Sequence, residues 1–202
     1  NKLWSQYIFF YPAPLLQNVY LRDLADLKGF GIFLENCNKF RDQVYIEKIH
    51  FNPSGLLESK MLSMLFDILF SSPTIVKELA VVAYGSNLAV LTNHMEQNLI
   101  WCSNLHKFTV ICQFLPILKL EHKLLKMCGK LQSLEILYTE VSTSMSSQAI
   151  RDYNTKNRHK DSLEQHLSLK HLTIANLVYK KSKIPLVKLP TCPALKELAL
   201  FG

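Results

Sequence analysis

The side chains best suited to metal binding or nucleophilic catalysis, cysteine and histidine, are scattered along this chain. Five cysteines and seven histidines occur in 202 residues. There is no Cys-x-x-Cys, and no cysteine or histidine pair has the spacing of a zinc site. We therefore predict no metal and no cofactor, and interpret the cysteines as reduced, half-buried thiols; a catalytic thiol or a disulfide framework is the alternative. The cysteines are Cys37, Cys102, Cys112, Cys128 and Cys192.

The motifs of the common catalytic sites are missing as well. The chain has no G-x-x-x-x-G-K-[ST] phosphate loop, no G-x-G-x-x-G turn, no G-x-S-x-G nucleophile elbow and no H-E-x-x-H helix. Its 6 glycines leave few turns that cradle phosphate. We predict that the protein is not an enzyme.

Lysine is the one charged residue with a regular spacing. Lys119, Lys123, Lys126 and Lys130 recur at i, i+4, i+7 and i+11, which predicts a single stripe along one helix. Residues 119–188 hold 13 of the 23 Lys and Arg but 6 of the 16 Asp and Glu, so they carry the whole net charge of +7. Such a patch suits nucleic acid phosphates or an acidic protein. The alternative is the solvated face of a helix.

A repeated pattern of apolar residues predicts the elements that position these side chains. Apolar residues at offsets 0, 3 and 5, as in "LKHLTI" and "LKELAL", occur seven times. The central residues of the seven copies are spaced by 30, 30, 29, 26, 38 and 26. Since the inward residues alternate, each copy is typical of a short strand. The central residues are Val19, Ile49, Leu79, Phe108, Leu134, Leu172 and Leu198.

Helical patterns lie between the copies. One predicted helical face carries Leu57, Met61, Met64, Leu65 and Ile68, and Pro73 ends that segment. The next helical face carries Leu88, Leu91, Met95 and Leu99. A third helix is expected to begin at Pro116 and to end near Gly129.

One strand and one helix make a unit of about 30 residues, which buries its apolar face only by stacking on its neighbours. We predict an α/β solenoid of about seven units, with a parallel sheet, as a single domain over 1–202. Strands are expected near 16–22, 46–52, 76–82, 105–111, 131–137, 169–175 and 195–201.

The copies resemble the leucine-rich repeat superfamily, whose motif is L-x-x-L-x-L-x-x-N/C-x-L. The chain departs at the ninth motif position, where it has Leu24, Ser54, Tyr84, Gln113, Thr139 and Leu177. We therefore expect irregular repeats. Their length is similar to that of the intracellular repeats of F-box substrate receptors, related ubiquitin-ligase adaptors and some innate-immune receptors. The resemblance implies a protein-interaction scaffold, and more narrowly a substrate-recognition or adaptor domain of a ubiquitin ligase.

In that superfamily the residues between the inward leucines lie on the concave face of the sheet. The resemblance therefore implies a partner-binding surface with Val82, Ile111 and Leu137 as its apolar centre. The alternative is that another part of the same protein covers this face. His50 and His171 would be four repeats apart, too far to share a metal. The polar and charged members of this surface are Tyr20, Arg22, Lys48, His50, Glu78, Lys107 and His171.

The remaining features bear on context. No apolar run reaches the roughly 18 residues that span a bilayer, so we expect no membrane partner. Cysteines interpreted as reduced indicate a cytoplasmic or nuclear protein. The chain begins with Asn and stops within a repeat, and we interpret it as a fragment. The polar insertion 141–166 is a candidate functional loop or a tolerated one. The alternative to protein binding is a basic scaffold for nucleic acid or chromatin.

Overall fold

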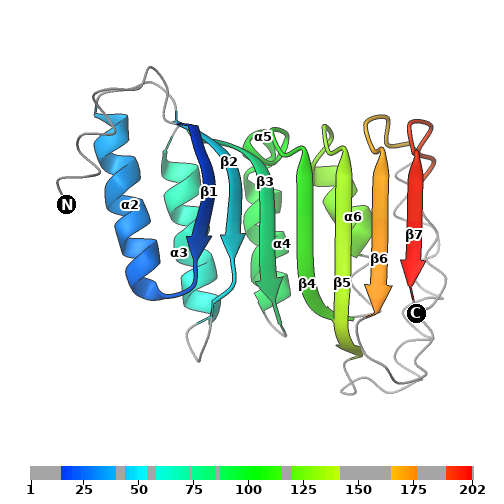
Figure 1. Cartoon of the computed structure of the whole chain (residues 1–202), viewed down its shortest axis with the longest axis horizontal. Coiled ribbons are helices and arrows are strands. Elements are labelled where there is room, and N and C mark those ends of the chain that lie inside the picture. The colour runs from blue at the N-terminus through cyan, green and yellow to red at the C-terminus, as the bar shows by residue number, and fades with distance from the viewer. Residues whose placement is uncertain are drawn as a thin grey trace.

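The computed structural model is an α/β fold built on one seven-stranded parallel sheet. The strands lie in chain order from β1 to β7, and the helices cover one face of the sheet (Figure 1). The sheet is open, with β1 and β7 at its edges. The structure describes residues 15–39, 44–53, 58–72, 74–84, 87–114, 120–141, 165–176 and 190–201.

Strands and helices alternate along the first five strands. The helices are α2 (Leu24–Asn38), α3 (Glu58–Ser71), α4 (Asn87–Gln97), α5 (Leu99–Cys102) and α6 (Leu120–Met127). This arrangement confirms the predicted α/β class and the parallel sheet. The strands are β1 (Leu15–Leu21), β2 (Val44–Phe51), β3 (Thr74–Ala83), β4 (Lys107–Phe114), β5 (Ser133–Val141), β6 (His171–Asn176) and β7 (Glu197–Phe201).

The seven central residues of the repeat lie side by side in register, each paired with the next across the sheet. The five inner members, from Ile49 to Leu172, are buried, and the two edge members are more exposed because each has a neighbouring strand on one side alone. The row is therefore a continuous apolar seam that joins all seven strands. At about 25 cal/mol per Å² of buried apolar area, such seams supply most of the driving force for stacking.

A turn that precedes the later strands carries a cysteine. The backbone N–H groups of Leu105, Leu131 and Leu195 donate to the carbonyl oxygens of Cys102, Cys128 and Cys192, at 2.9 to 3.1 Å. The first leucine of these copies is thus the residue that closes the turn, two residues before the strand. None of the five cysteines forms a disulfide, and Cys192 is the one that is not fully buried.

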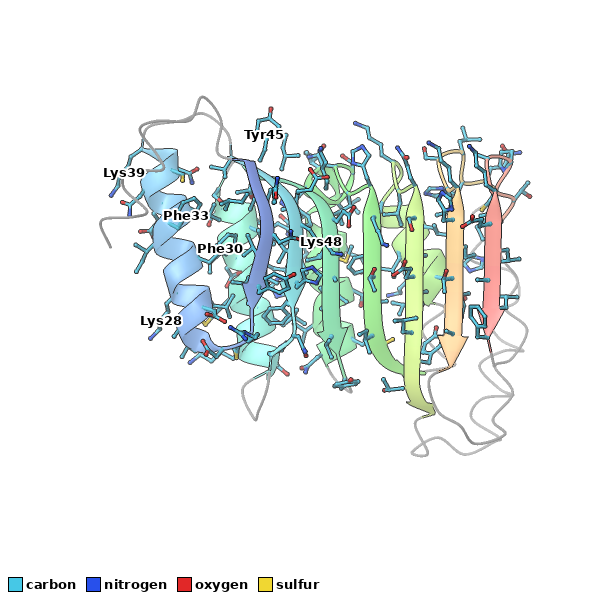
Figure 2. The ribbon with its side chains drawn as sticks, in the orientation of Figure 1. Lys28, Phe30, Phe33, Lys39, Tyr45 and Lys48 are labelled. Carbon is cyan, nitrogen blue, oxygen red and sulfur yellow. The ribbon has the colours of Figure 1, made fainter. Side chains whose placement is uncertain are left out.

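Helix α2 begins with a reciprocal cap. Asp23 accepts a hydrogen bond from the N–H of Asp26, and the Asp26 carboxylate accepts one from the N–H of Arg22 at 2.9 Å. Figure 2 shows Phe30 and Phe33 on the side of α2 that faces the neighbouring helix, and Lys28 on the opposite side.

Two predicted helical faces need correction. In α3 the buried residues are Met61, Leu62, Leu65, Phe66 and Leu69, whereas Met64 and Ile68 are half-buried. Helix α3 itself carries apolar residues around most of its circumference. Periodicity alone therefore predicted the wrong side of the helix as the buried one. Leu57, Pro73 and Pro116 lie outside the described residues.

The predicted face over α4 was wrong at its last residue. Leu88, Leu91 and Met95 are buried, but Leu99 is 51% exposed. The helix ends at Gln97, and Leu99 opens the short helix α5, which turns it away from the core.

The polar insertion is described at its two ends alone, since 142–164 lie outside the described residues. Its last residue, His166, belongs to the folded core. This imidazole is buried, with Nε2 3.2 Å from the carbonyl oxygen of Cys128.

Two leucines at equivalent repeat positions provide a test of the seam. Leu134 is 0% exposed, and Leu198 is 50% exposed. We expect Leu134→Ala to lower the free energy of unfolding by about 2–5 kcal/mol, because it leaves a cavity between two strands. We expect Leu198→Ala to cost less than about 1 kcal/mol. Urea denaturation measures both, and equal losses would contradict the seam.

Candidate functional site

The candidate site is the sheet face that no described helix covers, here called the open face. Side chains two residues apart along a strand share a face, so the register arranges them in rows across the sheet. The row nearest the strand starts is called the ion-pair row. It consists of Asn18, Lys48, Glu78, Lys107, Ser133, His171 and Glu197.

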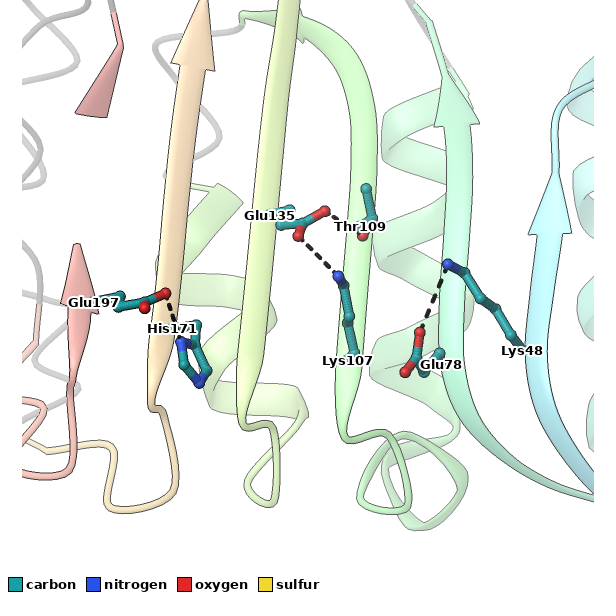
Figure 3. A network of polar contacts seen from close by, with 7 residues as sticks. All are labelled: Lys48, Glu78, Lys107, Thr109, Glu135, His171 and Glu197. Atoms are coloured by element: carbon teal, nitrogen blue, oxygen red, sulfur yellow. Dashed lines mark hydrogen bonds and ion pairs between the residues drawn. The ribbon is translucent and has the colours of Figure 1, made fainter. Parts of the chain in front are cut away.

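Charges on the open face occur in pairs on adjacent strands (Figure 3). Lys48 Nζ lies 3.7 Å from Glu78 Oε2, on β2 and β3. Lys107 Nζ lies 2.9 Å from Glu135 Oε1, on β4 and β5. His171 Nδ1 lies 3.0 Å from Glu197 Oε2, on β6 and β7. Lys48 and Lys107, the two lysines of this face, therefore each have a carboxylate beside them.

Glu135 is the best-held carboxylate of the open face. It accepts hydrogen bonds from Lys107 and, at 2.9 Å, from the hydroxyl of Thr109. Burial raises the pKa of Glu135, but these hydrogen bonds and the charges of Lys107 and Lys48 outweigh burial, so the pKa falls below its ordinary value. Glu135 is therefore ionised at neutral pH and is turned toward β4.

The end of the open face over β1 and β2 carries an aromatic pair. The rings of Tyr20 and His50 stack with centroids 4.6 Å apart and planes 5° from parallel. Burial and the nearby charge of Lys48 lower the pKa of His50, and Glu78 partly offsets them. The imidazole is thus neutral at neutral pH and acts as a flat, uncharged contact surface.

The second row, called the middle row, follows two residues further along the strands. Over β3 to β7 its side chains are small, apart from Glu135, which is held against β4. The row consists of Tyr20, His50, Ala80, Thr109, Glu135, Thr173 and Ala199.

The third row, called the apolar row, lies near the strand ends. Val82, Ile111 and Leu137 are half-buried and adjacent in register. Ala175, 7% exposed, and Phe201, 60% exposed, continue the row to β7. The apolar centre predicted from three residues therefore extends over five strands.

Nine of the ten predicted surface residues belong to these three rows. Arg22 does not, because it lies beyond the end of β1. Its guanidinium Nε is 3.8 Å from Asp26 Oδ2 at the start of α2. What the prediction missed is the pairing of the charges, which depends on the register between strands. The nine residues are Tyr20, Lys48, His50, Glu78, Val82, Lys107, Ile111, Leu137 and His171.

The predicted lysine stripe does not form on one helix. Helix α6 contains Lys123 and Lys126, whereas Lys130 lies in the turn after it and Lys119 is outside the described residues. Lys123 Nζ lies 3.0 Å from Glu96 Oε1 of α4. The helix ends at Met127 because the chain turns at Cys128 and Gly129 to enter β5.

Among the described residues, no group of three or more His, Cys, Asp or Glu has the geometry of a metal site. The described helices also include none that is long and apolar enough to cross a bilayer. No family model, no curated protein and no solved structure matches this chain.

The Lys107–Glu135 pair gives a prediction for pH titration. Lys107→Met should raise the pKa of Glu135 toward its ordinary value of 4.5, since both a hydrogen bond and a positive charge are lost. Lys77→Met is the matched control, because Lys77 pairs with Glu47 instead. Carboxyl NMR titration measures the shift.

The same pair predicts how stability depends on pH. A carboxyl whose pKa is lower in the folded state stabilises the fold above the unfolded-state pKa and loses that contribution as the pH falls. The free energy of unfolding should therefore fall more steeply below about pH 4.5 for the wild type than for Glu135→Gln. Parallel curves would contradict the assignment.

Proposed function

We propose that this chain is a leucine-rich-repeat solenoid that acts as a protein-interaction scaffold through the open face of its sheet. The proposal is supported above all by the apolar row, which sets half-buried aliphatic side chains beside a polar surface whose two lysines are paired with carboxylates. Seven copies of the apolar 0-3-5 pattern, whose central residues pair in register, support the repeat fold. An apolar patch with a polar rim is the usual make-up of a protein interface.

A protein partner fits the open face better than nucleic acid does. Nucleic acid affinity comes mostly from lysine and arginine that neutralise phosphates. On this face Lys48 and Lys107 are each beside a carboxylate, and on the helical side Lys123 pairs with Glu96. The nucleic acid alternative therefore rests on the net positive charge of residues 119–188. Within that segment, Lys126 and Lys130 are exposed.

Binding without bond-making also agrees with the state of the thiols. Burial, together with the charge of Glu121, raises the pKa of Cys112 to about 12. Contact with Cys102 and burial raise the pKa of Cys128. Since the thiolate is the nucleophile, these cysteines act as small apolar core residues.

The narrower role, substrate recognition or adaptor function in a ubiquitin ligase, rests on the resemblance of the repeats alone. The same resemblance supports a cytoplasmic or nuclear location. Five cysteines without a disulfide agree with a reducing compartment.

A matched pair of substitutions tests the proposal. Ile111→Glu places a charge in the apolar row, and Ile32→Glu makes the same change on α2, where Ile32 is 59% exposed. We expect Ile111→Glu to remove the proteins that the wild-type chain captures from cell extract, and Ile32→Glu to retain them. Circular dichroism confirms that both variants fold.

The identity and salt dependence of what is captured decide between the alternatives. Cullin-type ligase subunits in the captured set would support the adaptor role. Capture of the same proteins by the Ile111→Glu variant would contradict binding through the open face. Capture of nucleic acid that weakens steeply as salt rises would contradict it as well.

A further inference from the structure

The turns before β4 and β5 carry a cysteine at the same position. Cys102 ends α5 and Cys128 directly follows α6, at the edge of the sheet where the strands begin (Figure 1). Each cysteine N–H donates to a carbonyl oxygen four residues earlier, that of Asn98 or Leu124, at 3.1 and 3.0 Å. Each cysteine carbonyl oxygen accepts from the N–H of a leucine three residues later. The two cysteines are therefore equivalent in their backbone hydrogen bonds.

The register of β4 and β5 brings these two turns side by side. Lys107 and Ser133, each five residues after its cysteine, are the first pair of that register. Neighbouring strands are about 4.8 Å apart, and the Cα atoms of a disulfide are about 4.4–6.8 Å apart. The thiols also interact, since contact with Cys102, together with burial, raises the pKa of Cys128. The pair thus has the spacing that a disulfide requires.

The other three cysteines are placed differently. Cys37 belongs to α2, which packs on β1, β2 and α3. The register partners of Cys112 are an alanine and a tyrosine. Cys192 precedes β7 at the equivalent position, but the turn before β6 has His166 there, with Nε2 3.2 Å from the carbonyl oxygen of Cys128. Two strand spacings, about 10 Å, therefore separate Cys192 from Cys128, beyond the reach of a disulfide.

We propose that Cys102 and Cys128 form a reversible oxidation site, at which hydrogen peroxide converts the two thiols into a disulfide that joins the turns before β4 and β5. The inference is independent of the proposed function, because no residue of the open face takes part. The disulfide would tie together two neighbouring repeats that the reduced protein holds by packing and hydrogen bonds.

The reaction takes two steps. One thiolate attacks the peroxide, so that an S–O bond forms, the O–O bond breaks, and the departing hydroxide takes up the thiol proton as water. The second thiolate then attacks the sulfur of this sulfenic acid. The S–S bond forms, the S–O bond breaks, and a second water leaves with the second proton. Both sulfurs are oxidised and the peroxide is reduced to two waters, and a thiol reductant reverses the disulfide.

Burial determines when this site reacts. Both thiols are 0% exposed, and the thiolate is the attacking form, which burial disfavours at Cys128. In the closed molecule they are core residues. Oxidation therefore requires the turns that end α5 and α6 to open, and both helices are short, with 4 and 8 residues. We expect the reaction to be faster in urea concentrations just below the unfolding midpoint than in buffer.

Peroxide treatment of the whole chain, followed by alkylation of the remaining thiols and tryptic mapping, tests this inference. Trypsin separates three of the cysteines onto the peptides 78–107, 108–119 and 127–130. We expect the first and third peptides, which contain Cys102 and Cys128, to be linked with the loss of two hydrogen atoms. Dithiothreitol should release the link.

The urea-unfolded chain is the control for the effect of the fold. Cys112 lies 10 residues after Cys102 and 16 before Cys128, whereas the proposed partners are 26 residues apart. Shorter loops close more readily in an unfolded chain. Links through Cys112 should therefore dominate in the unfolded chain and be rare in the folded one.

Two substitutions of buried thiols form a matched pair. Cys128→Ala and Cys112→Ala each remove a thiol that is 0% exposed. Cys128→Ala should abolish the disulfide of the folded protein, and Cys112→Ala should retain it. A folded wild type that links through Cys112, or that forms no disulfide even just below the unfolding midpoint, would overturn the inference. A disulfide that forms equally well in Cys128→Ala would overturn it too.

The disulfide should also change stability. Because it closes a loop of 26 residues, the oxidised wild type should unfold at a urea concentration about 1 M higher than the reduced form does. Dithiothreitol should remove the difference, and Cys128→Ala should not show it. An oxidised form that is no more stable than the reduced form would contradict a native fold that already holds the two turns at the right distance.

Discussion

The structure depends on one constraint, the common register of seven parallel strands. Each strand contributes the same inward positions to a shared seam, so Ile49, Leu79, Phe108 and Leu134 lie against one another although about 30 residues separate them. A slip of one residue would turn a strand's whole apolar set to the other face of the sheet. The seam therefore fixes the order on the open face as well as the core.

That dependence links folding to surface chemistry. Lys48 meets Glu78 and His171 meets Glu197 because the register places them opposite each other on neighbouring strands. Single exposed ion pairs contribute at most about 1 kcal/mol, so they do not hold the sheet together. Their effect is on the surface. They make the region beside the apolar row polar, with each lysine next to a carboxylate.

Much of this organisation was predictable from the sequence because period-two alternation and a recurring 0-3-5 pattern are local signals. The seven paired central residues follow from them, whereas the nine surface residues follow from the resemblance to leucine-rich repeats. The buried side of α3 did not follow from these signals. Met61, Leu62, Met64 and Leu65 are all apolar, and which of them is buried depends on the neighbouring elements that each contacts. The end of α4 at Gln97 depends on the turn into α5, which no apolar pattern marks.

The charge pairs escaped prediction for a different reason. Composition locates the excess of lysine in 119–188, but pairing depends on distances across strands. Lys123 reaches Glu96 from a different helix, and Lys107 reaches Glu135 from the next strand. The cysteine turns escaped prediction because the apolar pattern begins at the leucine, three residues after Cys102, Cys128 and Cys192.

The most direct test of a single ordered open face is the distance between two of its residues in solution. Spin labels at Ala80→Cys and Ala199→Cys, on a Cys192→Ser background because the other native thiols are buried, report the span from β3 to β7. Four strand spacings predict a narrow distribution of electron–electron distances about 20 Å between backbones, plus the label arms. A broad distribution, or a mean beyond about 40 Å, would show that the repeats do not stack in register.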